Sequence, residues 1–168
     1  MGCEEQGRQE LARRRQRPAA QEQHEEQQGD LLISTDRARL DLGVMHAFLS
    51  DRSYWAAGIP REVLVRAIEG SLCFGVYRDG RQVGFARVVT DAATFAYLCD
   101  VFVLEEARSK GVGKWMMACV MRHPSLQGLR RFILATRDAH GLYQQYGFAP
   151  LKNPNSIMEI VNREVYRS

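Results

Sequence analysis

The sequence predicts one α/β domain of the α+β kind, built on a mixed, mostly antiparallel and strongly twisted sheet with helices on both faces. Its 168 residues, 45% of them hydrophobic, suffice for one core and are too few for two typical domains. Apolar runs of strand length and amphipathic patterns follow one another as strand, helix, helix, three strands, helix, strand, helix and strand. A two-residue hairpin signal joins two of the strands and makes them antiparallel.

The first 29 residues are expected to form a disordered tail, and the folded domain is expected to span residues 30–168. The tail is rich in Gln, Glu and Arg, and its only large aliphatic residue after Met1 is Leu11, so it cannot bury a core face. A transient helix, or a contact of the basic residues 13–17 with a partner, is the alternative for this segment.

The first part of the folded domain contains one strand and two helices. Residues 31–35 form an apolar run typical of a strand. Asp41 is placed as the N-cap of a helix that extends to about Ser50, because apolar residues follow it at helical spacing. Pro60 suits the first turn of a second helix, which Gly70 ends.

A hairpin and a long strand come next. Residues 72–77 and 82–89 are apolar runs on either side of Asp79-Gly80, which is a strong signal for a tight turn. Residues 94–104 are almost entirely apolar, as expected for a strand that is covered on both faces.

The C-terminal part alternates helices and strands. Residues 111–122 form an amphipathic helix that Pro124 closes, and residues 131–135 a buried strand. Residues 138–146 predict a short helix, and the alternating pattern of residues 156–161 predicts a final strand.

Composition argues against several functional classes. A net charge of +3 with 26% charged residues gives no basic surplus for nucleic acid, and no stretch approaches the roughly 20 apolar residues of a membrane span. The four cysteines include no Cys-x-x-Cys pair and favour a reducing, cytoplasmic location. The histidines lack metal-ligand spacing, so no metal is expected.

The sequence Arg-Ser-Lys-Gly-Val-Gly-Lys at residues 108–114 predicts an anion site. It lies between the long apolar strand and the first turn of a helix, where unpaired backbone N–H groups carry partial positive charge. Two glycines allow close approach of a ligand, and three basic side chains surround them. A pyrophosphate would fit this loop.

Two other phosphate motifs do not match the loop. A Walker loop needs glycine at Arg108 and Ser or Thr at Trp115, and a dinucleotide fingerprint needs glycine at Met116. A nucleotide-binding protein of the P-loop kind would bind ATP in preference to CoA.

Arg-x-x-Gly-x-Gly after a strand resembles the pyrophosphate motif of the GNAT superfamily of acetyl-CoA-dependent N-acetyltransferases. Residues 139–148 are similar to the superfamily's later motif Ala-x-x-x-Tyr-x-x-x-Gly-Phe, and the resemblance covers about residues 31–161. Two positions depart from the pattern. Ser109 replaces a frequent glycine, and Thr136 replaces a frequent asparagine that contacts pantetheine.

The resemblance implies that acetyl-CoA binds where the fourth and fifth strands splay apart, beside a β-bulge in the fourth strand. Backbone groups freed by the bulge would face pantetheine and the thioester carbonyl. The residues it assigns to the cofactor are Val101, Phe102, Val103, Arg108, Ser109, Lys110, Gly111, Val112, Gly113, Lys114 and Thr136.

The resemblance also assigns catalytic roles to two residues. Tyr143 would be the acid that protonates the thiolate of CoA, whereas an arbitrary tyrosine at this position would simply pack. Asp100, the one charge inside its strand and on the same face as Leu98 and Phe102, would attract and orient the amine. The alternative for Asp100 is a buried carboxylate tied to the backbone or to an arginine.

The acceptor is expected to be the primary amine of a small molecule or of a polyamine-like substrate. Tyr54 and Trp55, between the first two helices, could line its pocket, or could cap the core. The alternative function is a non-catalytic acetyl-CoA sensor. Members of the superfamily are often dimers, which leaves a homodimer open.

Overall fold

A computed structural model describes residues 23–166 of the chain. The strands are β1 (Glu25–Gln28), β2 (Leu31–Ser34), β3 (Leu72–Arg78), β4 (Arg81–Thr90), β5 (Phe95–Val103) and β6 (Arg131–Leu134). The helices are α2 (Leu42–Asp51), α3 (Arg61–Glu69), α4 (Val112–Arg122) and α5 (His140–Gln144). Single 3-10 turns are η1 (Arg37–Arg39), η2 (Glu105–Ala107), η3 (Pro124–Leu126) and η4 (Pro154–Ser156).

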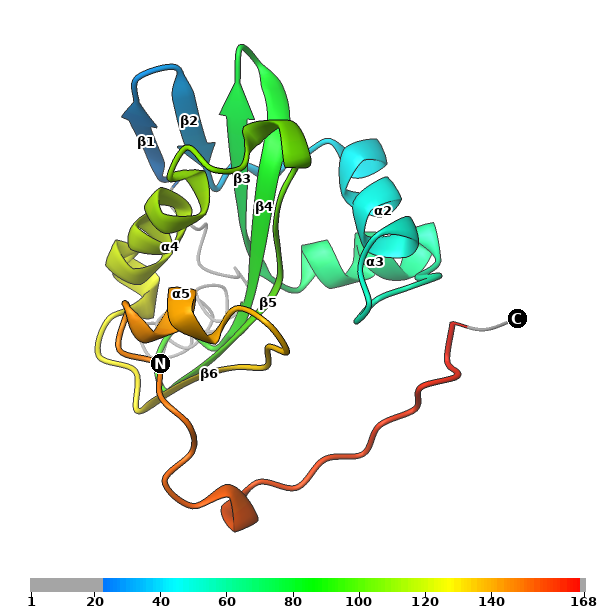
Figure 1. Cartoon of the computed structure of the whole chain (residues 1–168), viewed down its shortest axis with the longest axis vertical. Helices are drawn as coiled ribbons and strands as arrows, with labels where there is room; N and C mark the ends of the chain where they lie inside the picture. Colours follow the sequence, from blue (N-terminus) through cyan, green and yellow to red (C-terminus); the bar gives the residue numbers. More distant parts are fainter. Residues whose placement is uncertain (1–22, 167–168) are drawn as a thin grey trace, which may run out of the picture.

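The described strands form one sheet in the order β1-β2-β3-β4-β5-β6 (Figure 1). Neighbouring strands are antiparallel from β1 to β5, and β6 is parallel to β5. The parallel pair needs a crossover connection, which α4 supplies. The predicted mixed, mostly antiparallel sheet is confirmed.

Helices cover both faces of the sheet, as predicted. Figure 1 shows α2 and α3 on one side of the sheet and α4 and α5 on the other. Each pair encloses its own apolar cluster. On the α2–α3 side the cluster includes Met45, Leu49, Leu64, Phe85 and Phe102. On the α4–α5 side it includes Phe74, Leu98, Met116, Val120 and Tyr143.

Two local signals act as the sequence predicts. The Asp41 side chain accepts a hydrogen bond of 3.0 Å from the backbone N–H of Val44 and caps α2. Asp79 and Gly80 both have positive φ angles, 48° and 76°, which matches a tight turn that follows the twist of the flanking strands.

The folded part begins earlier than the predicted boundary near Asp30. β1 lies within residues 1–29, which were expected to be a tail, and pairs antiparallel with β2. Its side-chain contacts are polar: the Glu26 carboxylate accepts hydrogen bonds from Arg122 and Cys119 of α4. A composition argument that looks for apolar residues misses such a strand. Residues 1–22 lie outside the described part.

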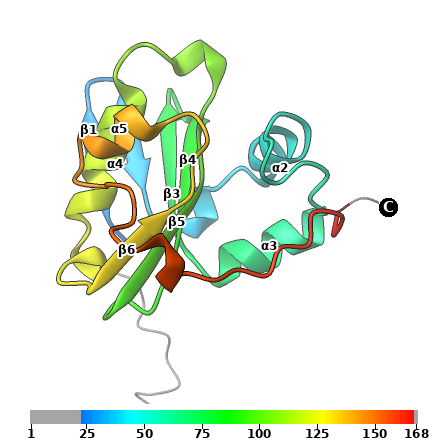
Figure 2. The same ribbon diagram turned by 60° about the horizontal axis from the view of Figure 1, so that its bottom comes forward.

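The predicted final strand at residues 156–161 is wrong for this structure. Residues 151–165 are exposed and pair with no described strand; apart from η4 and a turn that begins at residue 163, they are without regular structure. An alternating pattern forms a strand only beside a partner edge, and none of the strands within residues 23–166 pairs with this segment. We call residues 151–166 the strap. Figure 2 shows it passing from below β6 along α3.

None of the helices within residues 23–166 is both long enough and apolar enough to cross a membrane.

Candidate active site

The ladder between β4 and β5 is irregular in the middle of the sheet. β5 has two residues, Asp100 and Val101, where β4 has one, Ala86, and Asp100 has a φ of 53°. Such an extra residue reverses the alternation of side chains beyond it. Leu98 accordingly faces the α4–α5 cluster and Phe102 the α2–α3 cluster, so the expectation that they share a face is wrong.

β5 and β6 separate just beyond this irregularity. They pair only where Phe95 to Leu98 lie beside β6. A hollow of about 450 Å³, which we call the central hollow, opens past the last pair. It is lined by residues 97–101 of β5, by Leu134 at the end of β6 and residues 135–139 after it, and by Tyr54, Trp55 and Tyr143. The splayed strands and most of the predicted acceptor and catalytic residues therefore meet at one place.

Tyr143 lies between this hollow and a second one. The second hollow has a volume of about 320 Å³ and is bounded by β6 on one side and residues 148–151 on the other. Tyr143 lines both hollows and is 8% exposed. Burial raises the pKa of Tyr143 to about 12, and the nearby Tyr54 and Asp138 act in the same direction. The phenol is therefore protonated at neutral pH and able to donate a proton.

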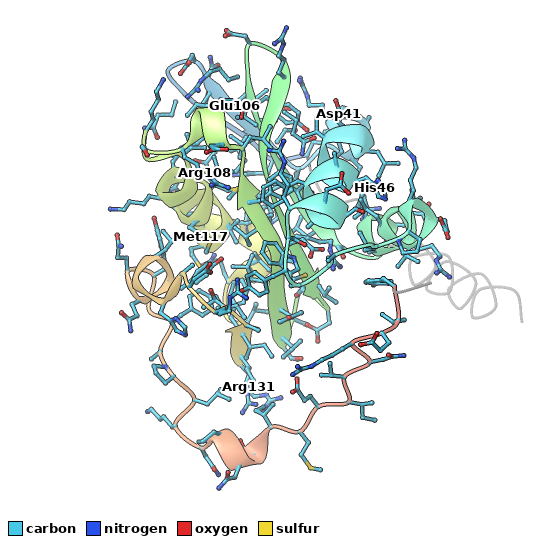
Figure 3. All side chains as sticks on the ribbon, turned by 45° about the vertical axis from the view of Figure 1, so that its right-hand side comes forward. Asp41, His46, Glu106, Arg108, Met117 and Arg131 are labelled. Atoms are coloured by element: carbon cyan, nitrogen blue, oxygen red, sulfur yellow. The ribbon has the colours of Figure 1, made fainter. Side chains whose placement is uncertain are left out.

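The loop at residues 108–114 presents its backbone at the start of α4. Gly111 is the N-cap, has a φ of 75°, and no side chain caps the helix there. A Cβ built on Gly111 would meet nothing within 4 Å, so the first turn is open to a ligand. Arg108, labelled in Figure 3, donates from Nε to the Val103 carbonyl at 2.9 Å. Open N–H groups beside basic side chains fit a pyrophosphate.

The other predicted residues of this loop divide between surface and core. Ser109, Lys110 and Lys114 are exposed, and Gly113 is half-buried, whereas Val112 is buried in the core. Ser109 has a φ of 65°, a backbone region where serine is strained and glycine is not. This conformation explains why glycine is frequent at this position in the resembling motif.

The remaining cofactor positions lie along β5 and after β6. Val101 and Val103 are half-buried, but the Phe102 ring stacks on Phe48 at 4.0 Å between centroids and belongs to the core. Only backbone atoms of Phe102 can therefore face a ligand. Thr136 lines both hollows, and its hydroxyl accepts a hydrogen bond of 3.0 Å from the N–H of Ala139, the N-cap of α5.

Asp100 is held by two partners and is 8% exposed. Its Oδ2 accepts a hydrogen bond of 2.6 Å from Nε of Arg87, and its Oδ1 accepts one of 3.1 Å from the Trp55 indole. Burial, the largest single influence, opposes the charge of Arg87, but Asp100, together with Cys99 and Cys73, raises the pKa of Arg87 on balance. The arrangement is the arginine-paired carboxylate that the sequence left as the alternative.

Arg87 is a site residue that the sequence analysis missed. It also donates from Nη1 to the hydroxyl of Ser71, the residue before β3, at 3.0 Å, so it links β4 both to β5 and to the start of β3. The signal was available, because Arg87 is a charged residue inside the apolar run of β4 just as Asp100 is inside β5. Two opposite charges on buried strands are best explained as a pair.

Tyr54 and Trp55 connect the α2–α3 loop to the far side of the central hollow. The Tyr54 hydroxyl accepts a hydrogen bond of 3.1 Å from the N–H of Arg137, whose guanidinium lies 3.8 Å above the Tyr54 ring centroid. Trp55 is bound to Asp100. Both aromatic side chains remain about two-fifths exposed, Tyr54 45% and Trp55 42%, so they can contact a ligand.

Within residues 23–166, no three His, Cys, Asp or Glu side chains gather in a way that could hold a metal ion.

Comparison with known proteins agrees with this geometry. Residues 69–150 match the family model described as "Acetyltransferase (GNAT) domain". This range contains the irregular β5, the loop at residues 108–114 and Tyr143. A protein of Gibberella zeae named "Putative acetyltransferase FG08082" is 37% identical over 137 residues, which are 68% of this chain and 76% of that protein.

Solved structures share the fold. A crystal structure from Xanthomonas campestris pv. campestris, described as a putative acetyltransferase belonging to the GNAT family, is 54% identical with a TM-score of 0.82. The match covers 84% of this chain and 100% of that one. A GNAT family acetyltransferase from Elizabethkingia anophelis with acetyl-CoA bound has a TM-score of 0.55 at 15% identity, over 73% of this chain and 78% of that one. With its splayed β5 and β6, the glycine loop at the start of α4 and these relatives, the chain belongs to the GNAT family of acetyltransferases.

Proposed function

We propose that the protein transfers the acetyl group of acetyl-CoA directly to a primary amine of a small molecule or polyamine-like substrate. The observation that carries the proposal is the position of Tyr143, a buried and protonated phenol between two hollows at the point where β5 and β6 separate. An acid at this place can protonate the sulfur that leaves a thioester bound in the cleft.

The donor binds at the loop end of the cleft. Acetyl-CoA supplies an activated acetyl thioester, and the open first turn of α4 suits its pyrophosphate. Arg108, Lys110 and Lys114 add positive charge around the same turn. The irregular stretch of β5 beyond Leu98 is unpaired on the β6 side, so its backbone can bond pantetheine and polarise the thioester carbonyl.

Tyr143 donates its phenolic proton to the departing CoA sulfur. A thiol has a pKa of about 8.5, so a proton transfer from a neutral phenol to the thiolate that forms is uphill by only a few pKa units. Burial keeps the phenol neutral until the thiolate develops. The adjacent hydroxyl of Thr136 keeps one donor for the pantetheine arm.

The acceptor binds in the central hollow. Trp55, Tyr54 and Tyr97 give the hollow an aromatic lining, which suits a cationic amine. Asp100 orients this amine through its carboxylate rather than removing a proton from it, because both of its oxygens already accept hydrogen bonds. Deprotonation of the amine then falls to solvent.

A panel of amines tests the proposal. CoA release is measured with acetyl-CoA and with aliphatic diamines, polyamines, aromatic amines and amino sugars as acceptors. We expect turnover with at least one small amine and loss of that turnover in Tyr143→Phe. Tight binding of acetyl-CoA with no turnover on any amine would instead support the sensor function.

A ligand comparison separates the donor from a nucleotide. Acetyl-CoA at a concentration far above its Kd should raise the melting temperature, whereas ATP at the same concentration should raise it less. A larger shift with ATP than with acetyl-CoA would favour a nucleotide as the ligand of this site.

A further inference from the structure

Arg137 is the one basic residue among the described residues that line the central hollow. It lies between β6 and α5, and it is exposed. Its guanidinium lies 3.8 Å above the centroid of the Tyr54 ring, and its backbone N–H donates to the Tyr54 hydroxyl at 3.1 Å. Two contacts with one tyrosine therefore hold both the backbone and the charged end of Arg137 at the wall of the hollow.

The guanidinium of Arg137 has no carboxylate partner in the part of the chain that the structure describes. The ion pairs between residues 23 and 166 do not include Arg137, and its sequence neighbour Asp138 does not pair with it. A guanidinium whose face lies on an aromatic ring keeps the N–H groups at its edge free. These N–H groups match the two oxygens of a carboxylate. Arg137 therefore offers a fixed binding site for an oxyanion.

The donor does not supply this oxyanion. In the proposed function, the phosphates of acetyl-CoA bind at residues 108–114, where the open first turn of α4 and three basic side chains meet. The pantetheine arm that extends from there into the cleft has amide and hydroxyl groups but no charge. An anion bound to Arg137 therefore belongs to the acceptor.

A row of two aromatic rings separates Arg137 from Asp100. Next to Arg137 is the Tyr54 ring, which makes a T-shaped contact with Trp55 at 5.0 Å between centroids. Trp55 in turn donates to Asp100 at 3.1 Å. All four residues line the central hollow. The hollow thus has a carboxylate at one end of this row and a guanidinium at the other.

We infer that the acceptor is an amino carboxylic acid, whose amine lies at the Asp100 end of the row and whose carboxylate binds the Arg137 guanidinium. The inference rests on the proposed function and narrows its acceptor. A polyamine would bring a second positive charge toward Arg137, and like charges repel. An acceptor with one charge of each sign is complementary to both ends of the row.

The charge around Arg137 favours a carboxylate over a phosphate. One guanidinium balances one negative charge, and the exposed Asp138 lines the same hollow. A phosphate monoester carries about −1.5 to −2 charges at neutral pH, so part of its charge would be left unbalanced beside Asp138. A carboxylate carries only one.

Matched acceptors test the inference. Release of CoA from acetyl-CoA is measured with glycine, 4-aminobutyrate and 6-aminohexanoate, each compared with its own carboxamide, which has the same length and no negative charge. At the chain length that reacts fastest, we expect kcat/KM to be about tenfold higher for the acid than for the amide. The diamine and the aminoalkyl phosphate of that length should both react more slowly than the acid. Faster reaction of either one would overturn the inference.

Substitution of Arg137 should remove this preference. In Arg137→Gln the acid and the amide should have nearly equal kcat/KM values, and in Arg137→Glu the diamine should become the better acceptor. The matched control is Arg131→Gln, because Arg131 is exposed and does not line the central hollow. The control should keep the wild-type ratio of acid to amide. A preference for the acid that survives in Arg137→Gln would contradict the inference.

Two variants of Tyr54 test whether its ring holds the guanidinium in place. Tyr54→Phe keeps the ring and should keep most of the preference for the acid. Tyr54→Leu removes the ring on which the guanidinium lies, so the ratio of acid to amide should fall toward one. An equal ratio in the two variants would show that the ring does not position Arg137 for the acceptor.

Binding without reaction separates this inference from the proposed function. CoA without its acetyl group lets an acceptor bind but not react, so calorimetry with CoA present compares the Kd values of 6-aminohexanoate and its amide directly. The acid should bind about tenfold more tightly to the wild type and no more tightly to Arg137→Gln. Absence of turnover with every amine would refute the proposed function and leave this comparison valid. Turnover with equal kcat/KM values for acids and amides would refute the inference alone.

Discussion

The two ends of the cleft between β5 and β6 are constructed in different ways. The donor end is a run of seven adjacent residues, 108–114, whose function rests on backbone N–H groups at the start of one helix. The acceptor end is assembled from the α2–α3 loop, β4, β5 and the segment after β6, and depends on side chains such as Arg87 and Asp100. Substitutions at the two ends should therefore affect different substrates.

Tyr143→Phe should reduce turnover without weakening the binding of either substrate. Removing a general acid lowers kcat by about 10²-fold to 10⁴-fold, while the KM values for acetyl-CoA and amine stay nearly unchanged. Steady-state CoA release measures all three constants. Tyr146→Phe is the matched control, because its hydroxyl donates to the Lys114 carbonyl and not into the central hollow. Wild-type kcat in Tyr143→Phe would remove this residue from the mechanism.

Gly111→Val should weaken only the donor end. A side chain at a φ of 75° strains the backbone by about 1–3 kcal/mol and obstructs the open turn, so the Kd for acetyl-CoA should rise about tenfold or more. Isothermal titration calorimetry measures this change. Gly128→Val has the same kind of strain at a φ of 69° outside the cleft, and there the Kd should not change. An equal loss of acetyl-CoA affinity in both variants would mean that backbone strain, and not obstruction of the turn, causes the effect.

Asp100→Asn should weaken the acceptor end and the fold together. The variant leaves the buried Arg87 without its charged partner, which lowers the free energy of unfolding by about 2 kcal/mol, and it raises KM for the amine about tenfold. Denaturant unfolding and amine titrations measure the two effects.

The double variant Arg87→Gln with Asp100→Asn separates these effects, because the neutral pair should recover stability but not amine use. Recovery of both would assign Asp100 a structural role only.

Raised pH should reduce stability through buried thiols, which is the smallest of these effects. Burial raises the pKa of Cys73 to about 12, whereas an unfolded thiol ionises near pH 8.5. Between these values the folded state holds the proton and the unfolded state loses it, so stability falls as pH rises. The melting temperature of Cys73→Ala should fall less than that of the wild type between pH 8 and pH 10. If the melting temperatures of the two proteins fell by the same amount over this pH range, Cys73 would make no such contribution.

The difference between the donor end and the acceptor end of the cleft also explains which parts of the site the sequence could predict. The loop at residues 108–114 and the cap at Asp41 use neighbouring residues, and their chemistry was evident from spacing. The pairing of Arg87 with Asp100 depends on the register between β4 and β5 and on an irregularity that adds one residue. Spacing along the chain carries no information on that register. The charge of Arg87 inside an apolar run was visible, but its partner was not, and the face of Phe102 was assigned wrongly.

The two errors in the fold have a related cause. β1 is held by polar contacts to α4, and the strap has a strand pattern without a strand beside it. In both segments the conformation depends on whether a partner that is remote in the sequence lies beside the segment. Counting apolar residues cannot detect β1, because its contacts are polar. The alternating pattern of the strap does not show whether a neighbouring strand is present.

The parallel pairing of β5 with β6 also bears on how the chain folds. The strands from β1 to β5 are neighbours in sequence order, whereas β6 reaches β5 only after α4 has crossed the sheet. Closing that contact is entropically more demanding than closing a hairpin. The catalytic cleft is thus made at a contact that no hairpin can close. Acetyl-CoA, which would contact β5, α4 and the segment after β6, would stabilise this contact when it binds. Slower exchange of the backbone amide hydrogens of β6 would report this stabilisation.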